Sequence, residues 1–146
     1  MPSGPGCSNA EPEAKLLPGF RSVEGRPVFF NSLGMQFVHL PESGVWLSIW
    51  ETRNRDYQPF LEEATREWPP LNFPREPDHP AVHVSWDDTR TFCWWLTERE
   101  RKTGLLGPEE GYRLPYGKEW SEVFGSQPFP WGASFPPTSI DGNYGL

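Results

Sequence analysis

The sequence has little of three things, which are cysteine, long apolar runs and clustered positive charge. Its two cysteines cannot form a disulfide framework, and no run of about 18 apolar residues offers a transmembrane helix. Thirteen basic residues against 20 acidic ones give a net charge of −7, and the basic residues are scattered. Because phosphate backbones bind grouped Lys and Arg side chains, we expect neither a nucleic acid nor a membrane as a partner.

The N-terminus also lacks the apolar segment of a secretory signal, so the cytoplasm is the default expectation. The first 26 residues are rich in proline and glycine and show no apolar period. We interpret residues 1–28 as a flexible leader or linker and expect the domain to occupy residues 29–146. Cys7 lies in this leader, where it would be an exposed thiol.

Proline and tryptophan, in contrast, are abundant, with 18 and 8 residues. Proline at this level forbids long regular elements, whereas the aromatic rings can anchor a core. The sequence therefore predicts an α+β domain with short elements and much ordered irregular backbone.

The first half of the domain is expected to hold a β-hairpin and a helix. A turn at Ser43-Gly44 separates two apolar runs, residues 37–40 and 45–50, as in a hairpin. Apolar residues then recur with the period of one helical face, which predicts a helix near residues 53–66 with Thr52 as its N-cap. After a proline-laden loop, residues 81–84 predict a short strand.

The strongest helix signal in the chain begins at Ser85, which forms a capping-box pattern with Asp88. Basic residues fill the last turn and Gly104 provides a stop, so we expect a helix over residues 86–102. A further small helix is expected near residues 118–124. The expected core residues are Trp86, Phe92, Leu96, Trp120 and Phe124.

Several residues could carry chemistry, but each also has a structural explanation. His79 and His83 are four apart, as zinc ligands on a helix would be. Pro80 separates them, and in a strand they would lie roughly 13 Å apart, so we favour two histidines beside a loop. The adjacent Asp87 and Asp88 could form a metal or general-acid pair, but capping of the helix N-terminus explains both.

Other candidates are weighed in the same way. Glu119 could be catalytic, yet an ion pair with Arg113 that orders the loop is favoured. Cys93 falls on the apolar side of a helix and is interpreted as a buried small hydrophobe. The aromatic residues Trp86, Trp94, Trp95, Trp120 and Trp131 could form a carbohydrate-stacking platform, but their helical spacing favours the core. The sequence shows no self-sufficient catalytic constellation.

Five motifs taken together resemble the formylglycine-generating enzyme family, also called the sulfatase-modifying factor domain. In order along the chain they are Asn31-Ser32-Leu33-Gly34-Met35, Ile49-Trp50-Glu51-Thr52, His79-Pro80 leading into Val84-Ser85-Trp86-Asp87-Asp88, Arg113-Leu114-Pro115 with Glu119-Trp120, and Pro130-Trp131-Gly132. The match runs from about Asn31 to Tyr144 and corresponds to the N-terminal half of the family domain.

The resemblance implies a C-type-lectin-like fold of the formylglycine-generating-enzyme type. The family activity is the copper- and oxygen-dependent oxidation of a sulfatase cysteine to formylglycine, so a sulfatase-like protein or peptide would be the substrate of a full-length protein. The family holds copper with two cysteines, and neither corresponds to Cys7 or Cys93, so the resemblance implies no catalytic residue in this chain. Asn143 and the Tyr144 carbonyl match the first part of the family's calcium site, a ligand type that suits this cation.

The sequence departs from the family pattern at several loops. His83 stands where the family usually has Asn, and Tyr116-Gly117 stand where it usually has Thr-Glu. Residues 123–126 replace an Ala-Arg-Gly-Gly-type segment. Three readings follow: an inactive fragment of a formylglycine-generating-enzyme-like protein, a non-enzymatic lectin-like binding module, or the accessory half of an iron-dependent sulfoxide synthase. The third is disfavoured because no His-rich region is present.

Overall fold

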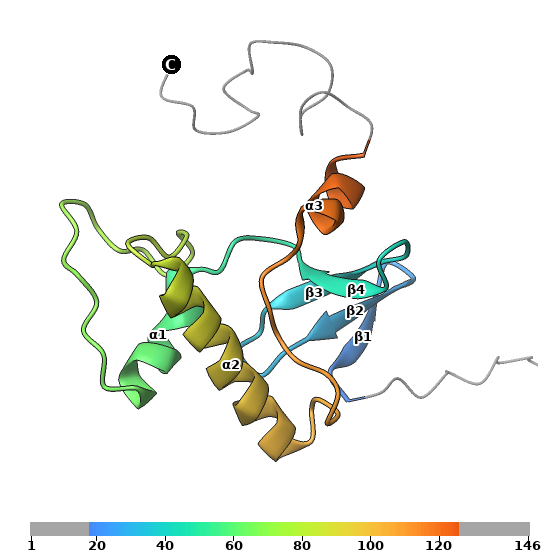
Figure 1. Ribbon diagram of the computed structural model, residues 1–146, viewed down its shortest axis with the longest axis horizontal. Helices are drawn as coiled ribbons and strands as arrows, with labels where there is room; N and C mark the ends of the chain where they lie inside the picture. Colours follow the sequence, from blue (N-terminus) through green and yellow to red (C-terminus); the bar gives the residue numbers. More distant parts are fainter. Residues whose placement is uncertain (1–17, 126–146) are drawn as a thin grey trace, which may run out of the picture.

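In the computed structural model, residues 18–125 can be described, and they form a small α+β fold (Figure 1). The described part holds one four-stranded antiparallel sheet, in which the strands pair in sequence order. The strands are β1 (Phe20–Val23), β2 (Arg26–Phe30), β3 (Gln36–Leu40) and β4 (Val45–Ser48). The helices are α1 (Asn54–Glu63), α2 (Trp86–Thr103) and α3 (Gly117–Phe124). The α+β class expected from the sequence is therefore confirmed.

The first hairpin corrects the predicted leader over residues 1–28. Strands β1 and β2 pair with Val23 opposite Arg26, so that Glu24 and Gly25 alone form the turn. Both turn residues have positive φ, 51° and 77°, as a two-residue hairpin turn requires. Phe20 packs against Phe29 and Trp46 with ring centroids 5.2 and 5.0 Å apart. The part of the predicted leader from Phe20 onward therefore belongs to the sheet, and Phe20 itself contacts the core.

The second hairpin follows the sequence prediction. Strands β3 and β4 pair with Leu40 opposite Val45, across the turn that contains Ser43 and Gly44. The predicted second strand is shorter than expected, because it ends at Ser48 rather than at residue 50. Phe37 lies in β3 and is buried on the side of the sheet that meets the helices.

The core lies between the sheet and the two longer helices, which lie side by side in Figure 1. Its buried members are Phe29, Met35, Phe37, Tyr57, Phe60, Leu61, Phe92 and Leu96. The periodic apolar positions of the two predicted helices supply five of these eight side chains. The expected burial of Phe92 and Leu96 is confirmed, with 4% and 1% of their surface exposed.

Both ends of α2 follow the sequence signals. The Ser85 hydroxyl accepts the Asp88 N–H, and the Asp88 carboxylate accepts the Ser85 N–H, each at 3.1 Å. Gly104 ends the helix in the left-handed conformation, with φ 74°. The N-cap of α1 is Arg53 rather than the predicted Thr52, because the Asp56 carboxylate accepts the Arg53 N–H at 2.9 Å.

Three expectations about the loop before α2 and about the helices are wrong. Residues 81–84 form no strand, and His83 has φ 58°, which an extended strand cannot accommodate. Helix α3 forms close to the predicted residues, but Trp120 and Phe124 do not point inward, since 45% and 40% of their surface is exposed. Trp86 is likewise 64% exposed rather than buried. No helix between residues 18 and 125 is long and apolar enough to cross a membrane.

Candidate functional site

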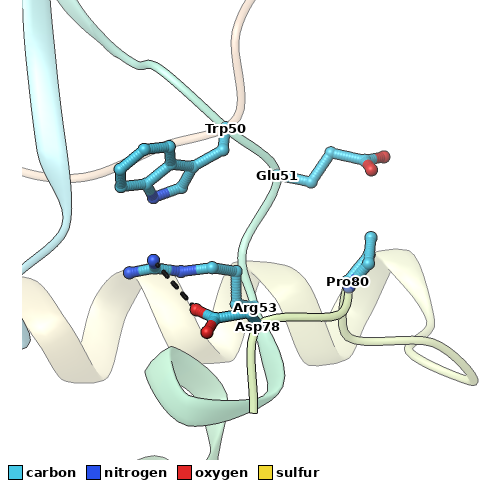
Figure 2. Close-up of a pocket in the computed structure, with 5 residues that line it drawn as sticks. All are labelled: Trp50, Glu51, Arg53, Asp78 and Pro80. Carbon is cyan, nitrogen blue, oxygen red and sulfur yellow. Dashed lines mark hydrogen bonds and ion pairs between the residues drawn. The ribbon is translucent and has the colours of Figure 1, made fainter. Parts of the chain in front are cut away.

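The described residues include one pocket that combines an aromatic face with charged groups (Figure 2). It has a volume of about 310 Å³ and is lined by Trp50, Glu51, Arg53, Asp78 and Pro80. The first three follow β4 and lead into α1, whereas Asp78 and Pro80 belong to the loop before α2. A backbone bridge between Arg53 and Pro80 holds the two segments together.

Arg53 is the central side chain of this pocket. Its Nε and Nη2 atoms donate to the two carboxylate oxygens of the buried Asp56, at 2.9 and 3.0 Å. The guanidinium carbon lies 4.5 Å from the centroid of the Trp50 ring, which is a cation–π contact. Nη1 reaches the Asp78 carboxylate at 3.4 Å, the contact drawn as a dashed line in Figure 2. Arg53 is therefore fixed from three sides.

The electrostatics of the pocket suit binding rather than proton transfer. Hydrogen bonding to Asp56 raises the pKa of Arg53 above its ordinary value. A hydrogen bond from Arg55 lowers the pKa of the Asp78 carboxyl. Both groups therefore stay charged across neutral pH, whereas a general acid or base needs a pKa near the working pH.

Cys93 has the environment of a structural cysteine. Its thiol is half-buried on α2, and burial raises the pKa of the thiol. A reactive cysteine needs the opposite shift, toward the thiolate. The expectation of a buried small hydrophobe is thus met in part, since some of the side chain remains exposed.

The described residues do not fit the copper centre implied by the family resemblance. Copper(I) prefers soft thiolate ligands, and Cys93 is the single cysteine between residues 18 and 125. This part of the chain also holds no group of three or more His, Cys, Asp or Glu side chains that could bind a metal ion. The candidate calcium ligands Asn143 and Tyr144, like Cys7 and Trp131, lie outside the described residues.

The structural role proposed for Glu119 agrees with its contacts. Its carboxylate accepts two hydrogen bonds from the Arg113 guanidinium, at 2.6 and 2.8 Å, and one from the Tyr116 N–H at 2.7 Å. The side chain is 2% exposed. The Arg113 hydrogen bonds lower the pKa of the Glu119 carboxyl to about 2. This pair, in which both groups are charged at neutral pH, fixes the loop that precedes α3.

A buried carboxylate that the sequence reasoning missed joins three distant parts of the fold. Glu100 is fully buried on α2 and accepts hydrogen bonds from the N–H and hydroxyl groups of Ser32, both at 2.8 Å. Its other oxygen accepts the Tyr112 hydroxyl at 2.5 Å. Burial, and then this bond, raise the pKa of Tyr112 strongly. The charge pattern of α2 gave no sign of this role, because Glu100 stands among other charged residues.

The other residues considered as site candidates in the sequence, the aspartates of α2, His79 and the tryptophans, have structural roles or are exposed. Asp88 caps α2 as predicted, and Asp87 lies in the first turn of the same helix. His79 supplies a backbone carbonyl to the Asn54 N–H at 2.9 Å. The core interpretation of the tryptophans is wrong for Trp94 as for Trp86 and Trp120, because 65% of Trp94 is exposed.

The comparison with protein families identifies the chain. A model of the sulfatase-modifying factor enzyme 1-like domain matches residues 14–143. The chain belongs to this family. Because the match begins at residue 14, the family domain, like the sheet, starts before residue 29.

Three curated members of the sulfatase-modifying family resemble this chain over part of their length. The inactive C-alpha-formylglycine-generating enzyme 2 of Bos taurus is 34% identical over 64 residues, which are 41% of this chain and 17% of the relative. The formylglycine-generating enzyme of Bos taurus is 32% identical over 75 residues, or 49% and 16% of the two chains. The formylglycine-generating enzyme of Thermomonospora curvata is 27% identical over 113 residues, or 73% and 34%.

The chain thus spans about a third or less of the length of these relatives. It is similar to the bovine relative named inactive and to the bovine formylglycine-generating enzyme to almost the same degree, so the degree of identity does not separate the two. No solved structure matches this chain.

Proposed function

We propose that this chain supplies the N-terminal part of a sulfatase-modifying domain and acts there as a scaffold, not as the reactive centre. The observation that carries the proposal is the family match over residues 14–143, combined with the small share of each relative that the chain covers. The domain's activity would be the copper- and oxygen-dependent conversion of a sulfatase cysteine to formylglycine. The thiolate pair for copper would come from a part of the domain other than the one described.

The described contacts support a scaffold role. Each of the three fully buried carboxylates, Asp56, Glu100 and Glu119, accepts three hydrogen bonds from its own surroundings. A buried carboxylate with fixed partners holds backbone in place and is not exposed to a substrate. The half-buried thiol of Cys93, with its raised pKa, is also a poor nucleophile and metal ligand.

The proposal also names a substrate for the whole domain and a calcium site. A sulfatase-like protein or peptide would be the partner of the whole domain. Asn143 and the Tyr144 carbonyl would supply about two of the six to eight oxygens that calcium takes, with the others beyond Leu146. Calcium would then join the two parts of the domain.

A peptide oxidation assay tests the proposal. The chain alone is incubated with a peptide that carries a sulfatase-type cysteine, together with copper and oxygen, and formylglycine is detected by mass spectrometry. We expect no product above the level formed by copper alone. Product above that level would show that these 146 residues contain a reactive centre, and the scaffold role would be wrong.

A second candidate function is a non-enzymatic, lectin-like binding module of the same superfamily. The observation in its favour is the pocket at Trp50 and Arg53, whose charged groups suit binding rather than proton transfer. The two candidates differ in the sequence that follows codon 146. A downstream cysteine pair in a Gly- and Arg-rich segment would support the enzyme, and its absence would support the binding module.

A further inference from the structure

Helix α3 carries its polar and apolar residues on two clearly separated faces. Trp120, Val123 and Phe124 lie on one apolar stripe of the helix, and the N-cap residue Tyr116, four positions before Trp120, extends it. At 3.6 residues per turn, Glu122 lies on the opposite side of the helix and Glu119 lies at the edge of the stripe, next to Val123. In a surface helix of a globular domain, the apolar stripe normally faces the core.

In this structure the polar face of α3 is the one attached to the rest of the fold. Glu119 is buried in its ion pair with Arg113. The Glu122 carboxylate accepts the N–H groups of Glu42 and Ser43 at 2.8 and 3.1 Å, in the turn between β3 and β4. Figure 1 shows α3 next to this end of the sheet, away from α1 and α2. Carboxylates on two successive turns thus hold the helix.

The apolar face of α3, in contrast, is turned away from the described core. All four residues of the stripe are between 40% and 61% exposed, and none belongs to the core cluster. The Trp120 and Phe124 rings stack on each other, with centroids 5.6 Å apart and planes within 14°. Contiguous exposed apolar surface of this kind marks a site of contact with another polypeptide surface.

We infer that the apolar face of α3, formed by Tyr116, Trp120, Val123 and Phe124, is the surface on which the remaining part of the sulfatase-modifying domain packs. This inference rests on the proposed function, in which the chain is the N-terminal part of that domain. The occupant presents an apolar surface with a hydrogen-bond acceptor for the Trp120 indole N–H, which usually finds a partner when buried.

The size of the relatives favours this occupant over a second copy of the chain. The Thermomonospora curvata relative is matched over 34% of its length, so about two thirds of it lies outside the matched stretch. Helix α3 is the last described element, and its attachment through Glu119 and Glu122 fixes the orientation of its apolar face. A second copy or the chain's own residues after 125 are outcomes that the experiment separates.

The experiment is hydroxyl-radical footprinting, read residue by residue by mass spectrometry. The full chain is compared with a fusion in which the part of the Thermomonospora curvata relative that follows the matched stretch is appended after Leu146. We expect the oxidation rate of Trp120 to fall at least about fourfold, the ratio between its 45% exposure and the roughly 10% of a core side chain. Phe73, which is 51% exposed in the loop before α2, is the control and should keep its rate.

An unchanged rate at Trp120 in a folded fusion would overturn the inference. So would a Trp120 that is already as protected as Phe92 in the full chain alone, because the chain or a second copy would then cover the face. Formylglycine production by the fusion is measured in parallel. If Trp120 is protected but no formylglycine forms, the inference holds and the proposed function is wrong. If formylglycine forms but Trp120 is not protected, the proposed function holds and the inference is wrong.

A variant of the chain alone keeps the inference testable if the fusion does not fold. Replacing Trp120 and Val123 by Ser in the 146-residue chain should leave its melting temperature nearly unchanged, because neither side chain packs on the described core. The double variant should also associate less at high concentration, as sedimentation would show. A fall in melting temperature of more than about 4 °C would mean that the face is already buried, and would refute the inference.

Discussion

Truncation of Phe92 to Ala is the most direct test of the core. Its ring is 4% exposed and lies at the meeting point of both long helices. The centroids of Tyr57, Phe60 and Trp95 lie 5.3, 5.8 and 5.8 Å from it. Removing the ring therefore leaves a cavity lined by three other aromatic side chains that are held by their own helices.

The expected loss of stability follows from the area buried. A phenylalanine ring that leaves water removes roughly 150 Å² of apolar surface, which at about 25 cal/mol per Å² is about 4 kcal/mol. Measured costs for buried Phe→Ala replacements, about 3–5 kcal/mol, cover the same range. Since small domains are stable by only about 5–15 kcal/mol, Phe92→Ala should be close to unfolding.

Urea denaturation followed by far-ultraviolet circular dichroism measures this loss. Phe92→Leu is a milder substitution at the same position. It should lower the free energy of unfolding by less than about 1.5 kcal/mol, because most of the side-chain volume is kept. Trp94→Ala is the matched control on the same helix, and its 65% exposure predicts a change within about 0.5 kcal/mol. If Trp94→Ala cost as much as Phe92→Ala, or if Phe92→Ala cost less than about 1 kcal/mol, the placement of the core would be wrong.

Three further predictions concern titration, thiol chemistry and metal binding. Because the folded-state pKa of Glu119 is lowered from 4.5 to about 2, its pair with Arg113 stabilises the fold above pH 4.5 and loses this effect as the pH falls toward 2. Melting curves against pH should therefore be flatter in this range for Glu119→Gln than for the parent chain. In a Cys7→Ser chain, Cys93 should react with Ellman's reagent at pH 8 only slowly until urea unfolds the protein, and fast reaction of the folded chain would contradict its burial. Calorimetric titration of the full chain with calcium should show only weak binding, and micromolar affinity would show that more ligands are present than Asn143 and Tyr144.

The regular elements were largely predictable because their signals are local. The capping pattern at Ser85, the stop at Gly104 and the apolar period between them define α2 almost to the residue. The β3–β4 hairpin follows from two apolar runs around Ser43-Gly44. Each of these features depends on residues close in sequence, so the pattern alone is sufficient.

The first hairpin was missed because its turn lacks a strong signal. Glu24-Gly25 forms the turn, with Glu24 at φ 51°, whereas Asn-Gly or Asp-Gly is the usual indicator. Prolines around it made the segment resemble a linker. Arg21, Arg26 and Glu24 are exposed, so one side of the hairpin is largely polar, and only Phe20 and Phe29 mark its inner side.

The error at residues 81–84 has a different cause, since a single residue reverses the backbone. His83 adopts the left-handed conformation, with φ 58°. Asn, Asp and His are the non-glycine residues that most often do so. The resemblance noted in the sequence suggests Asn at this position in the family, and Asn and His share a tolerance of this conformation. Alternation of apolar residues could not reveal this reversal.

The candidate site was predictable only where it depended on a local pair. Arg113 and Glu119 are six residues apart and were identified as a structural ion pair, which the contacts confirm. The Glu100 network joins Ser32, Tyr112 and α2 across 68 residues of sequence, and no local pattern indicates such a contact. The same limit applies to the pocket at Trp50, whose walls come from two segments more than 20 residues apart.

The exposed tryptophans and the buried carboxylates have one explanation. A chain with 18 prolines cannot stabilise its connections with long helices and strands, so buried carboxylates brace them instead: Asp56 at the entry to α1, Glu100 between α2 and the first half of the fold, and Glu119 before α3. Hydrogen bonds to charged groups are stronger than neutral ones, and they therefore suit the stabilisation of irregular backbone.

Hydrogen bonds of this kind attach α3 to the rest of the described fold through its glutamate side chains. The helical period therefore placed Trp120 and Phe124 correctly on one face of a helix. The error was to expect this face to pack against the elements that precede α3. In the arrangement proposed here, that face belongs to the core of the complete domain, and its aromatic residues become buried only when the two parts of the domain meet.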